Sequence, residues 1–223
     1  MEPAREPALS ESDAGDPPPF ERIAADLAVR GWSVVEQALP AALATALEQE
    51  VRGARGGDFQ PATIGRQQDR TLNGAVRRDA IRWIDGDTAA QRDWLAWTTR
   101  LQTHLNRRLF LGLFSYESHF AHYPPGAFYR RHVDAFRGDA NRVLSTVLYL
   151  NRSWRAQDGG ELLLYPEAGD QPLLRLTPAL GTLALFLSEA FPHEVLPAAR
   201  DRYSIAGWFR VNTSTASRVD PPR

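Results

Sequence analysis

Apolar residues near the start of the chain recur at helical spacing. Between residues 20 and 30, Ile23 and Leu27 lie four positions apart, which places them on one face of a helix. Gly31 is a suitable stop for that helix, because glycine readily ends helices. The apolar run 32–35 that follows predicts a short strand.

A second helix is predicted to carry Pro40 in its first turn and to run to about Val51, with Leu43 and Leu47 among its apolar residues. The segment 53–74 is polar, contains several glycines and lacks sustained periodicity. We therefore expect a long surface loop there, of the kind that often covers a binding site.

A third helix is predicted after the extended segment 79–84. Asp87 or Thr88 can cap its first turn. Its apolar stripe consists of Trp94, Leu95, Trp97, Leu101 and Leu105. A helix with one apolar face of this size should pack against a sheet.

The second half of the chain changes to short β-rich runs separated by Gly, Pro and Asp. These runs span residues 116–123, 128–133, 143–150, 161–165, 173–176, 182–188, 193–197 and 204–211. Many short strands of this kind are typical of an antiparallel sandwich or jelly roll. Helices followed by strands predict an α+β fold in which the helices pack on one sheet.

The chain of 223 residues is long enough for one substantial core, and we assign the domain to residues 20–211. Residues 1–19 are rich in proline and acidic residues, so we expect a disordered arm there. Residues 212–223 are predicted to form a flexible polar tail.

Composition excludes several classes of protein. The net charge of −1 gives no broad basic field, so a nucleic-acid partner is not expected. The absence of cysteine excludes disulfides and thiolate sites, and the absence of lysine excludes a Schiff base. No secretory signal or membrane-spanning run is evident, so a cytoplasmic location without a membrane partner is expected. The arginine-only, alanine-rich composition suggests a bacterial source with GC-rich codons.

His132 and Asp134 are the first candidates for chemistry. Residues two apart in an extended segment point to the same face, so this pair can share an ion with a distant histidine, His193. Two imidazoles and one carboxylate are the ligand set of the non-haem iron(II) oxygenases. The alternative is that His132 is a surface histidine beside Arg130 and Arg131.

Arg202 supplies a cation for the anionic tail of a co-substrate. A planar guanidinium can bind the distal carboxylate of 2-oxoglutarate through two charge-assisted hydrogen bonds. Arg202 shares its strand face with Ser204, Ala206 and Trp208, which we expect to be the inner face. The alternative is a salt bridge at the edge of the barrel.

Short motifs in one order resemble the prolyl hydroxylase domain family, which includes the animal hypoxia-sensing enzymes and their bacterial relatives. These motifs lie within residues 60–211 and are Tyr123-Pro124-Pro125-Gly126, Arg131-His132-Val133-Asp134, Leu148-Tyr149-Leu150-Asn151, Gly159-Gly160, Tyr165-Pro166-Glu167, Pro192-His193-Glu194-Val195 and Arg202-Tyr203-Ser204-Ile205. The resemblance implies a double-stranded β-helix, or jelly roll.

The resemblance also assigns roles to residues. It implies that His132, Asp134 and His193 bind iron(II), and that Arg202, Tyr149 and Tyr123 lie around 2-oxoglutarate. Val147, Leu162 and Trp208 match pocket walls. The alternative is ordinary barrel core, which we expect for Val147 and Leu162 rather than direct contact with a ligand. Arg142, Arg77 and Asp79 match positions at the substrate side, and Arg78 replaces a glycine of the family.

Three further histidines carry weaker expectations. His104 lies on the polar face of the third predicted helix, and His122 has the wrong strand parity to point inward with Tyr123. His119 either approaches the metal or is a hydrogen-bonded structural residue.

The function implied is hydroxylation of a prolyl residue in a protein or peptide substrate. Iron(II), 2-oxoglutarate and dioxygen are the cofactors and co-substrates, ascorbate is the expected reductant, and succinate and carbon dioxide are the co-products. Two alternatives stay open: a hydroxylase of a small molecule such as a free amino acid, and a non-enzymatic metal-binding barrel.

Overall fold

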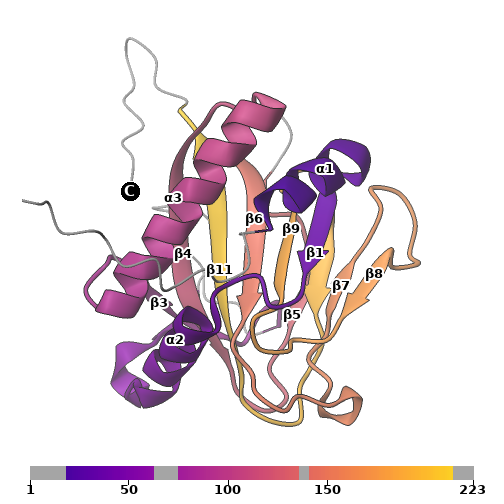
Figure 1. Cartoon of the computed structure of the whole chain (residues 1–223). Helices are drawn as coiled ribbons and strands as arrows, with labels where there is room; N and C mark the ends of the chain where they lie inside the picture. The colour runs from indigo at the N-terminus through magenta and orange to yellow at the C-terminus, as the bar shows by residue number, and fades with distance from the viewer. Residues whose placement is uncertain (1–18, 63–74, 136–140, 213–223) are drawn as a thin grey trace, which may run out of the picture.

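The computed structural model describes residues 19–62, 75–135 and 141–212 (Figure 1). The predicted N-terminal arm lies outside this part of the chain except for Pro19, and the tail lies outside it except for Asn212. Residues 63–74 of the predicted surface loop also lie outside it.

The predicted helices are present close to their expected bounds. They are α1 (Phe20–Arg30), α2 (Ala41–Gly53) and α3 (Ala89–Leu109). Gly31 ends α1 in the left-handed conformation, at φ 76°, which glycine adopts without strain. Thr88 caps α3 through its side-chain oxygen, which accepts a hydrogen bond from the backbone N–H of Gln91. Two short 3-10 turns, η1 (Gly56–Asp58) and η3 (Ala156–Asp158), lie in the connections.

The larger sheet is antiparallel and has the strand order β1-β9-β6-β11-β4-β3-β2. Its strands are β1 (Trp32–Val35), β2 (Gln60–Pro61), β3 (Ala80–Trp83), β4 (Leu113–Tyr123), β6 (Arg142–Tyr149), β9 (Leu183–Leu187) and β11 (Arg202–Val211). Long β11 lies between β4 and β6, with Ser204 opposite both Ala121 and Tyr149. The alternation of side chains predicted for residues 204–211 therefore belongs to a strand at the centre of this sheet.

The smaller sheet is also antiparallel and has the order β5-β10-β7-β8. Its strands are β5 (Tyr129–His132), β7 (Leu162–Leu164), β8 (Leu174–Leu176) and β10 (His193–Val195). His193 at the start of β10 pairs with His132 at the end of β5. This register brings two distant segments of the chain side by side.

The two faces of the larger sheet bury different side chains. The helices cover one face (Figure 1). There the two tryptophans of α3, Trp94 and Trp97, stack in the main core with ring centroids 5.7 Å apart. On this face the sheet contributes Phe120, Leu144, Leu148, Ile205 and Phe209. The other face packs on the smaller sheet, and there Ala121, Tyr123, Tyr149, Ala184 and Phe186 meet Leu162, Leu164 and Val195. The candidate site lies on this second face.

Candidate metal and co-substrate site

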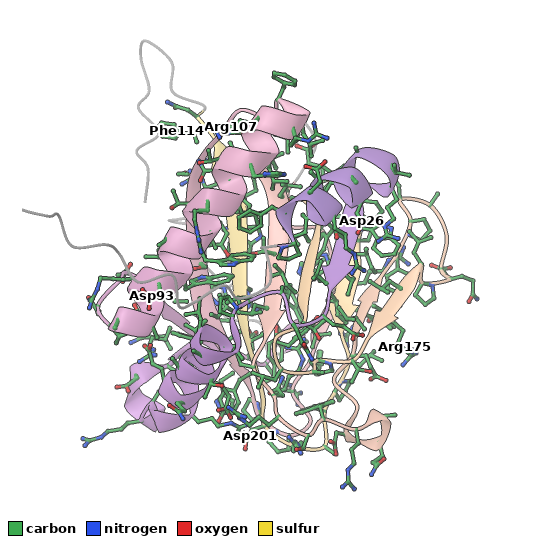
Figure 2. The ribbon with its side chains drawn as sticks, viewed as in Figure 1. Asp26, Asp93, Arg107, Phe114, Arg175 and Asp201 are labelled. Atoms are coloured by element: carbon green, nitrogen blue, oxygen red, sulfur yellow. The ribbon has the colours of Figure 1, made fainter. Side chains whose placement is uncertain are left out.

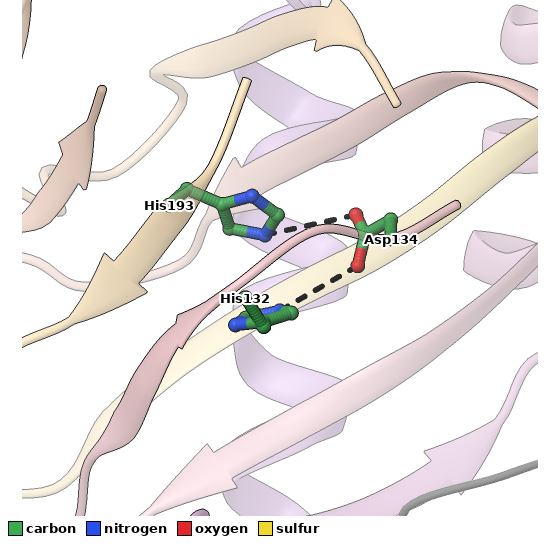
Figure 3. A group of neighbouring side chains, drawn as sticks. All are labelled: His132, Asp134 and His193. Carbon is green, nitrogen blue, oxygen red and sulfur yellow. Dashed lines mark ion pairs between the residues drawn. The ribbon is translucent and has the colours of Figure 1, made fainter. Parts of the chain in front are cut away.

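The predicted ligands His132, Asp134 and His193 converge (Figure 3). Their candidate ligand atoms all lie within 4.8 Å of one another. The Nε2 atoms of His132 and His193 are each 3.6 Å from an oxygen of Asp134, from Oδ1 and Oδ2 respectively. The strand β5 stops at His132, so Asp134 reaches the cluster from the bend that follows and not from the strand itself.

Backbone carbonyls fix the orientation of both imidazoles. The Nδ1 atom of His132 lies 2.8 Å from the oxygen of Arg130, and the Nδ1 atom of His193 lies 3.1 Å from the oxygen of Phe191. Because a carbonyl only accepts, both Nδ1 atoms donate, and in a neutral ring the lone pair is left on Nε2. Both lone pairs therefore face Asp134.

The protonation states also suit a cation. Burial lowers the pKa of His193 to about 4, so its ring is neutral at pH 7. Burial alone would raise the pKa of Asp134, but the adjacent His193 and His132 and a hydrogen bond from Ser145 hold it below its ordinary value. The cluster thus offers the Nε2 atoms of two imidazoles and a carboxylate, and these residues fit iron(II) or a similar divalent ion.

Arg202 is a buried cation that lacks an anionic partner among the described residues. Its side chain is fully enclosed, with 1% of the residue exposed. Its Nε donates to the oxygen of Gly160 at 2.9 Å, and Nη1 contacts Ser204 Oγ at 3.4 Å. Its Nη2 and the hydroxyl of Tyr149 are both buried without a hydrogen-bond partner in the described structure. Unpaired buried donors are costly, so this pair fits the carboxylate of a bound co-substrate.

Two aromatic rings and a glycine define the position of this guanidinium. It lies 4.9 Å from the ring centroid of Tyr123 and 5.1 Å from that of Tyr149. A Cβ atom at Gly160 would come within 3.2 Å of Arg202 Cδ, and Gly160 has φ +71°. The second glycine of the Gly159-Gly160 motif thus permits the close approach of the arginine stem. Burial raises the pKa of Tyr149 to about 12, so its hydroxyl remains a donor.

Comparison with known proteins agrees with this geometry. The sequence profile of the 2OG-Fe(II) oxygenase superfamily matches residues 118–210. The crystal structure of a Pseudomonas putida prolyl-4-hydroxylase has a TM-score of 0.77 and 44% sequence identity, over 86% of this chain and 98% of that one. This chain belongs to the prolyl hydroxylase family of the 2OG-Fe(II) oxygenases.

Two further members of the prolyl hydroxylase family are informative. The hypoxia-inducible factor prolyl hydroxylase of Caenorhabditis elegans is 31% identical over 192 residues, which is 80% of this chain but 26% of that protein. The chain therefore spans about a quarter of the length of that relative. A prolyl hydroxylase from Trichoplax adhaerens, in complex with a hypoxia inducible factor oxygen degradation domain peptide fragment, has a TM-score of 0.74 and 29% identity, over 86% of this chain and 88% of that one. The family and jelly-roll predictions are confirmed.

The expected wall residues of this family member lie around the same face. Val147 and Leu162 pack with the aromatic and aliphatic residues between the sheets. The guanidinium of Arg142 lies 3.7 Å from the ring centroid of Trp208 and donates to Glu117 at 2.7 and 3.1 Å. The indole N–H of Trp208 is buried without an acceptor among the described residues. Contacts of these residues with a co-substrate or substrate remain predictions.

Arg77 and Asp79 pair with each other. Their two charge-assisted hydrogen bonds measure 2.7 and 2.6 Å, and the Asp79 side chain is fully buried. The backbone N–H of Arg78 donates to Phe128, and the residue does not have a positive φ, so replacing the glycine of the family causes no backbone strain here. The predicted role of Arg77 and Asp79 in substrate binding remains a prediction.

The other three histidines lie away from the candidate metal ligands, each on the face that its place in a helix or strand gives it. His104 bonds Glu21 on the surface. His122 bonds Asp201, which is labelled in Figure 2, at 2.7 Å on the outer side. His119 is buried between Trp83 and Trp208, and burial lowers its pKa to about 4. It is not part of the metal-ligand cluster in the described structure.

Sequence reasoning missed three residues that surround the ligands. The ring of Tyr129 stacks on His132. The hydroxyl of Ser145 donates a hydrogen bond to Asp134, and the hydroxyl of Ser188 is hydrogen-bonded to that of Ser145. Ser145 could have been found from the sequence, because it lies two residues before Val147 on one strand and therefore points to the same inner face. Ser188, which follows the strand β9, offered no comparable signal in the sequence.

Proposed function

We propose that the protein is a 2-oxoglutarate- and iron(II)-dependent dioxygenase that hydroxylates a prolyl residue of a protein or peptide. One observation carries this proposal. The buried, unpaired guanidinium of Arg202 lies on the sheet face that packs against the two strands bearing His132 and His193. A barrel that only bound a metal would have no use for a buried cation lacking an anion.

Each residue would have a distinct task. His132, Asp134 and His193 would hold the ion, while Arg202 and Tyr149 would bind the distal carboxylate of 2-oxoglutarate and orient its other end toward the ion. When bound, iron(II) supplies the redox chemistry by which 2-oxoglutarate and dioxygen give succinate, carbon dioxide and a hydroxylated carbon. The apolar residues between the sheets would exclude water from this reaction.

The prolyl substrate is proposed from two relatives. The Pseudomonas putida structure is described as a prolyl-4-hydroxylase, and the Trichoplax adhaerens enzyme holds a peptide fragment. Ascorbate as reductant and a cytoplasmic setting are part of the same proposal. None of the helices in the described part of the chain combines the length and the hydropathy that a membrane span requires.

Succinate release tests the reaction class. With iron(II), ascorbate, 2-oxoglutarate and proline-containing peptides, we expect succinate from the wild type and at least 100-fold less from Asp134→Ala and Arg202→Ala, since both change groups in the reacting assembly. Arg200→Ala, at a partly exposed arginine near the same strand, is the matched control. Equal succinate production by all of these proteins would exclude the oxygenase.

Mass spectrometry tests the substrate. A gain of one oxygen on proline in peptides incubated with the protein supports a protein substrate. Hydroxylation of free proline, together with unchanged peptides, would show a small-molecule hydroxylase instead.

A further inference from the structure

Two buried serines form a hydrogen-bonded path to the carboxylate of Asp134. Ser145 lies on β6 with 1% exposure, and its Oγ is 2.6 Å from Asp134 Oδ2. Ser188 directly follows β9 with 0% exposure, and its Oγ is 2.9 Å from that of Ser145. Ser145 lies in the larger sheet and Ser188 directly follows a strand of it, whereas His132 and His193 lie in the smaller sheet.

The chemistry of the three groups determines which of them donates and which accepts each hydrogen bond. A carboxylate that holds a metal ion is deprotonated, so Asp134 in that role only accepts hydrogen bonds, and the hydroxyl of Ser145 lies 2.6 Å from it. The single proton of Ser145 must therefore point to Oδ2. Ser188 then donates to the oxygen of Ser145, which gives the order Ser188 to Ser145 to Asp134.

We propose that Ser145, oriented by Ser188, makes Asp134 a ligand through one oxygen only. Each oxygen of Asp134 lies 3.6 Å from one imidazole, Oδ1 from His132 Nε2 and Oδ2 from His193 Nε2. The hydrogen bond from Ser145 draws charge from Oδ2 and occupies one of its lone pairs, which leaves Oδ1 as the stronger donor to the ion. Ser145 is therefore a positioning residue, and this inference rests on the metal site of the proposed function.

The number of ligand atoms gives this role its importance. If His132, His193 and one oxygen of Asp134 held iron(II), an ion that accepts six ligand atoms would keep enough positions for 2-oxoglutarate and dioxygen. A carboxylate that bound through both oxygens would leave only two, and 2-oxoglutarate would fill them. The hydrogen bond from Ser145 thus keeps a position free for dioxygen.

Manganese(II), a paramagnetic substitute for iron(II), allows this to be measured without turnover. We expect the wild-type complex with manganese(II) and 2-oxoglutarate to retain one exchangeable water on the ion, detected by water proton relaxation. Ser145→Ala should lose that water and bind manganese(II) about 10-fold more weakly, as expected when a partner of a ligand is removed. Ser188→Ala should weaken binding about 3-fold, and Ser145→Thr, which keeps the hydroxyl, should stay within about 2-fold of wild type.

Ser118→Ala is the matched control. Ser118 is equally buried, at 1% exposure, but its hydroxyl meets Trp94 on the helix-covered side, so manganese(II) binding and bound water should not change. If Ser145→Ala retains both the water and the wild-type dissociation constant, the inference is wrong. If Ser145→Ala fails to fold, Ser188→Ala decides, and wild-type affinity and hydration in that variant would overturn the ordered path.

Asp134→Ala separates this inference from the proposed function. If it loses manganese(II) while Ser145→Ala behaves as wild type, the metal site stands and only the role of the serines fails. If Asp134→Ala binds manganese(II) as wild type does, the proposed metal site itself is wrong.

Discussion

The ring of Tyr129 lies flat against the imidazole of His132, with centroids 3.5 Å apart and planes 16° from parallel. Strict strand alternation would put residues three apart on opposite faces, but the pairing of β5 with β10 shifts register between His193 and Val195, so an extra residue of β5 is accommodated. Arg77 covers the other side of Tyr129, 4.3 Å from its ring centroid. His132, a proposed metal ligand, is thus held by a stack as well as by its hydrogen bond to the backbone oxygen of Arg130.

The stack should contribute to metal affinity. Tyr129→Ala is expected to weaken manganese(II) binding about 5-fold, because an aromatic pair contributes about 1 kcal/mol. Tyr129→Phe retains the ring and should bind within about 2-fold of wild type. Calorimetric titration measures both variants. Equal losses in the two would assign the effect to the hydroxyl and not to stacking.

Binding of 2-oxoglutarate to Arg202 should increase the stability of the folded protein. 2-Oxoglutarate at about 100 times its dissociation constant, with manganese(II) present, should raise the free energy of unfolding of the wild type by about 2.7 kcal/mol. Arg202→Met removes the charge and should abolish most of this gain, while the ligand-free protein loses little because a buried unpaired cation is itself unfavourable.

Denaturant titration with and without 2-oxoglutarate measures this effect of Arg202. Arg200→Met, at a partly exposed neighbouring arginine, should respond like the wild type. A full ligand-induced gain in Arg202→Met would show that the carboxylate binds elsewhere.

Gly160 offers a test of the close approach of Arg202. An added Cβ would meet Ala198 Cβ at 2.9 Å and Arg202 Cδ at 3.2 Å, at φ +71°. Gly126 has a similar φ of +78° but no atom within 4 Å of an added Cβ. Gly126→Ala should therefore lose about 1 to 2 kcal/mol of stability from backbone strain alone. Gly160→Ala should lose more and raise the KM for 2-oxoglutarate, and equal KM values for the two variants would contradict this.

The buried imidazole of His119 should make stability depend on pH. Burial lowers its pKa from 6.5 to about 4, so between these values the unfolded chain binds more protons than the folded one. The free energy of unfolding should therefore fall on acidification, by about 2 kcal/mol between pH 7 and pH 4.5 from this residue. His193, whose pKa is also lowered to about 4, acts in the same direction.

Denaturant titrations of the metal-free protein at the two pH values measure this dependence. His119→Gln should reduce the loss on acidification by about half, because only His193 then remains of the pair. His104→Gln, at a surface position bonded to Glu21, is the control. A pH dependence unchanged by His119→Gln would show that its ring is not buried as neutral imidazole.

The sequence predicted most elements because their periodicity is local. The apolar positions of α1 and the alternation along β11 both follow from which face each residue buries, so Leu27 and Arg202 were placed correctly. Tyr129 was missed because its orientation depends on a bulge in the pairing with β10. Ser188 was missed because its partner, Ser145, is distant in sequence, and a hydroxyl in an apolar run signals no particular contact.

His132 and His193 face each other across β5 and β10, yet a long stretch of chain separates them. The strand β5 has four residues, and besides β10 it is joined within the described chain to Arg77 by an isolated bridge. An ion shared by the two histidines and Asp134 would add a further link between β5 and β10. Protein synthesised during iron starvation should accordingly be degraded sooner by cellular proteases. The supply of iron would then set the lifetime of the protein as well as its activity.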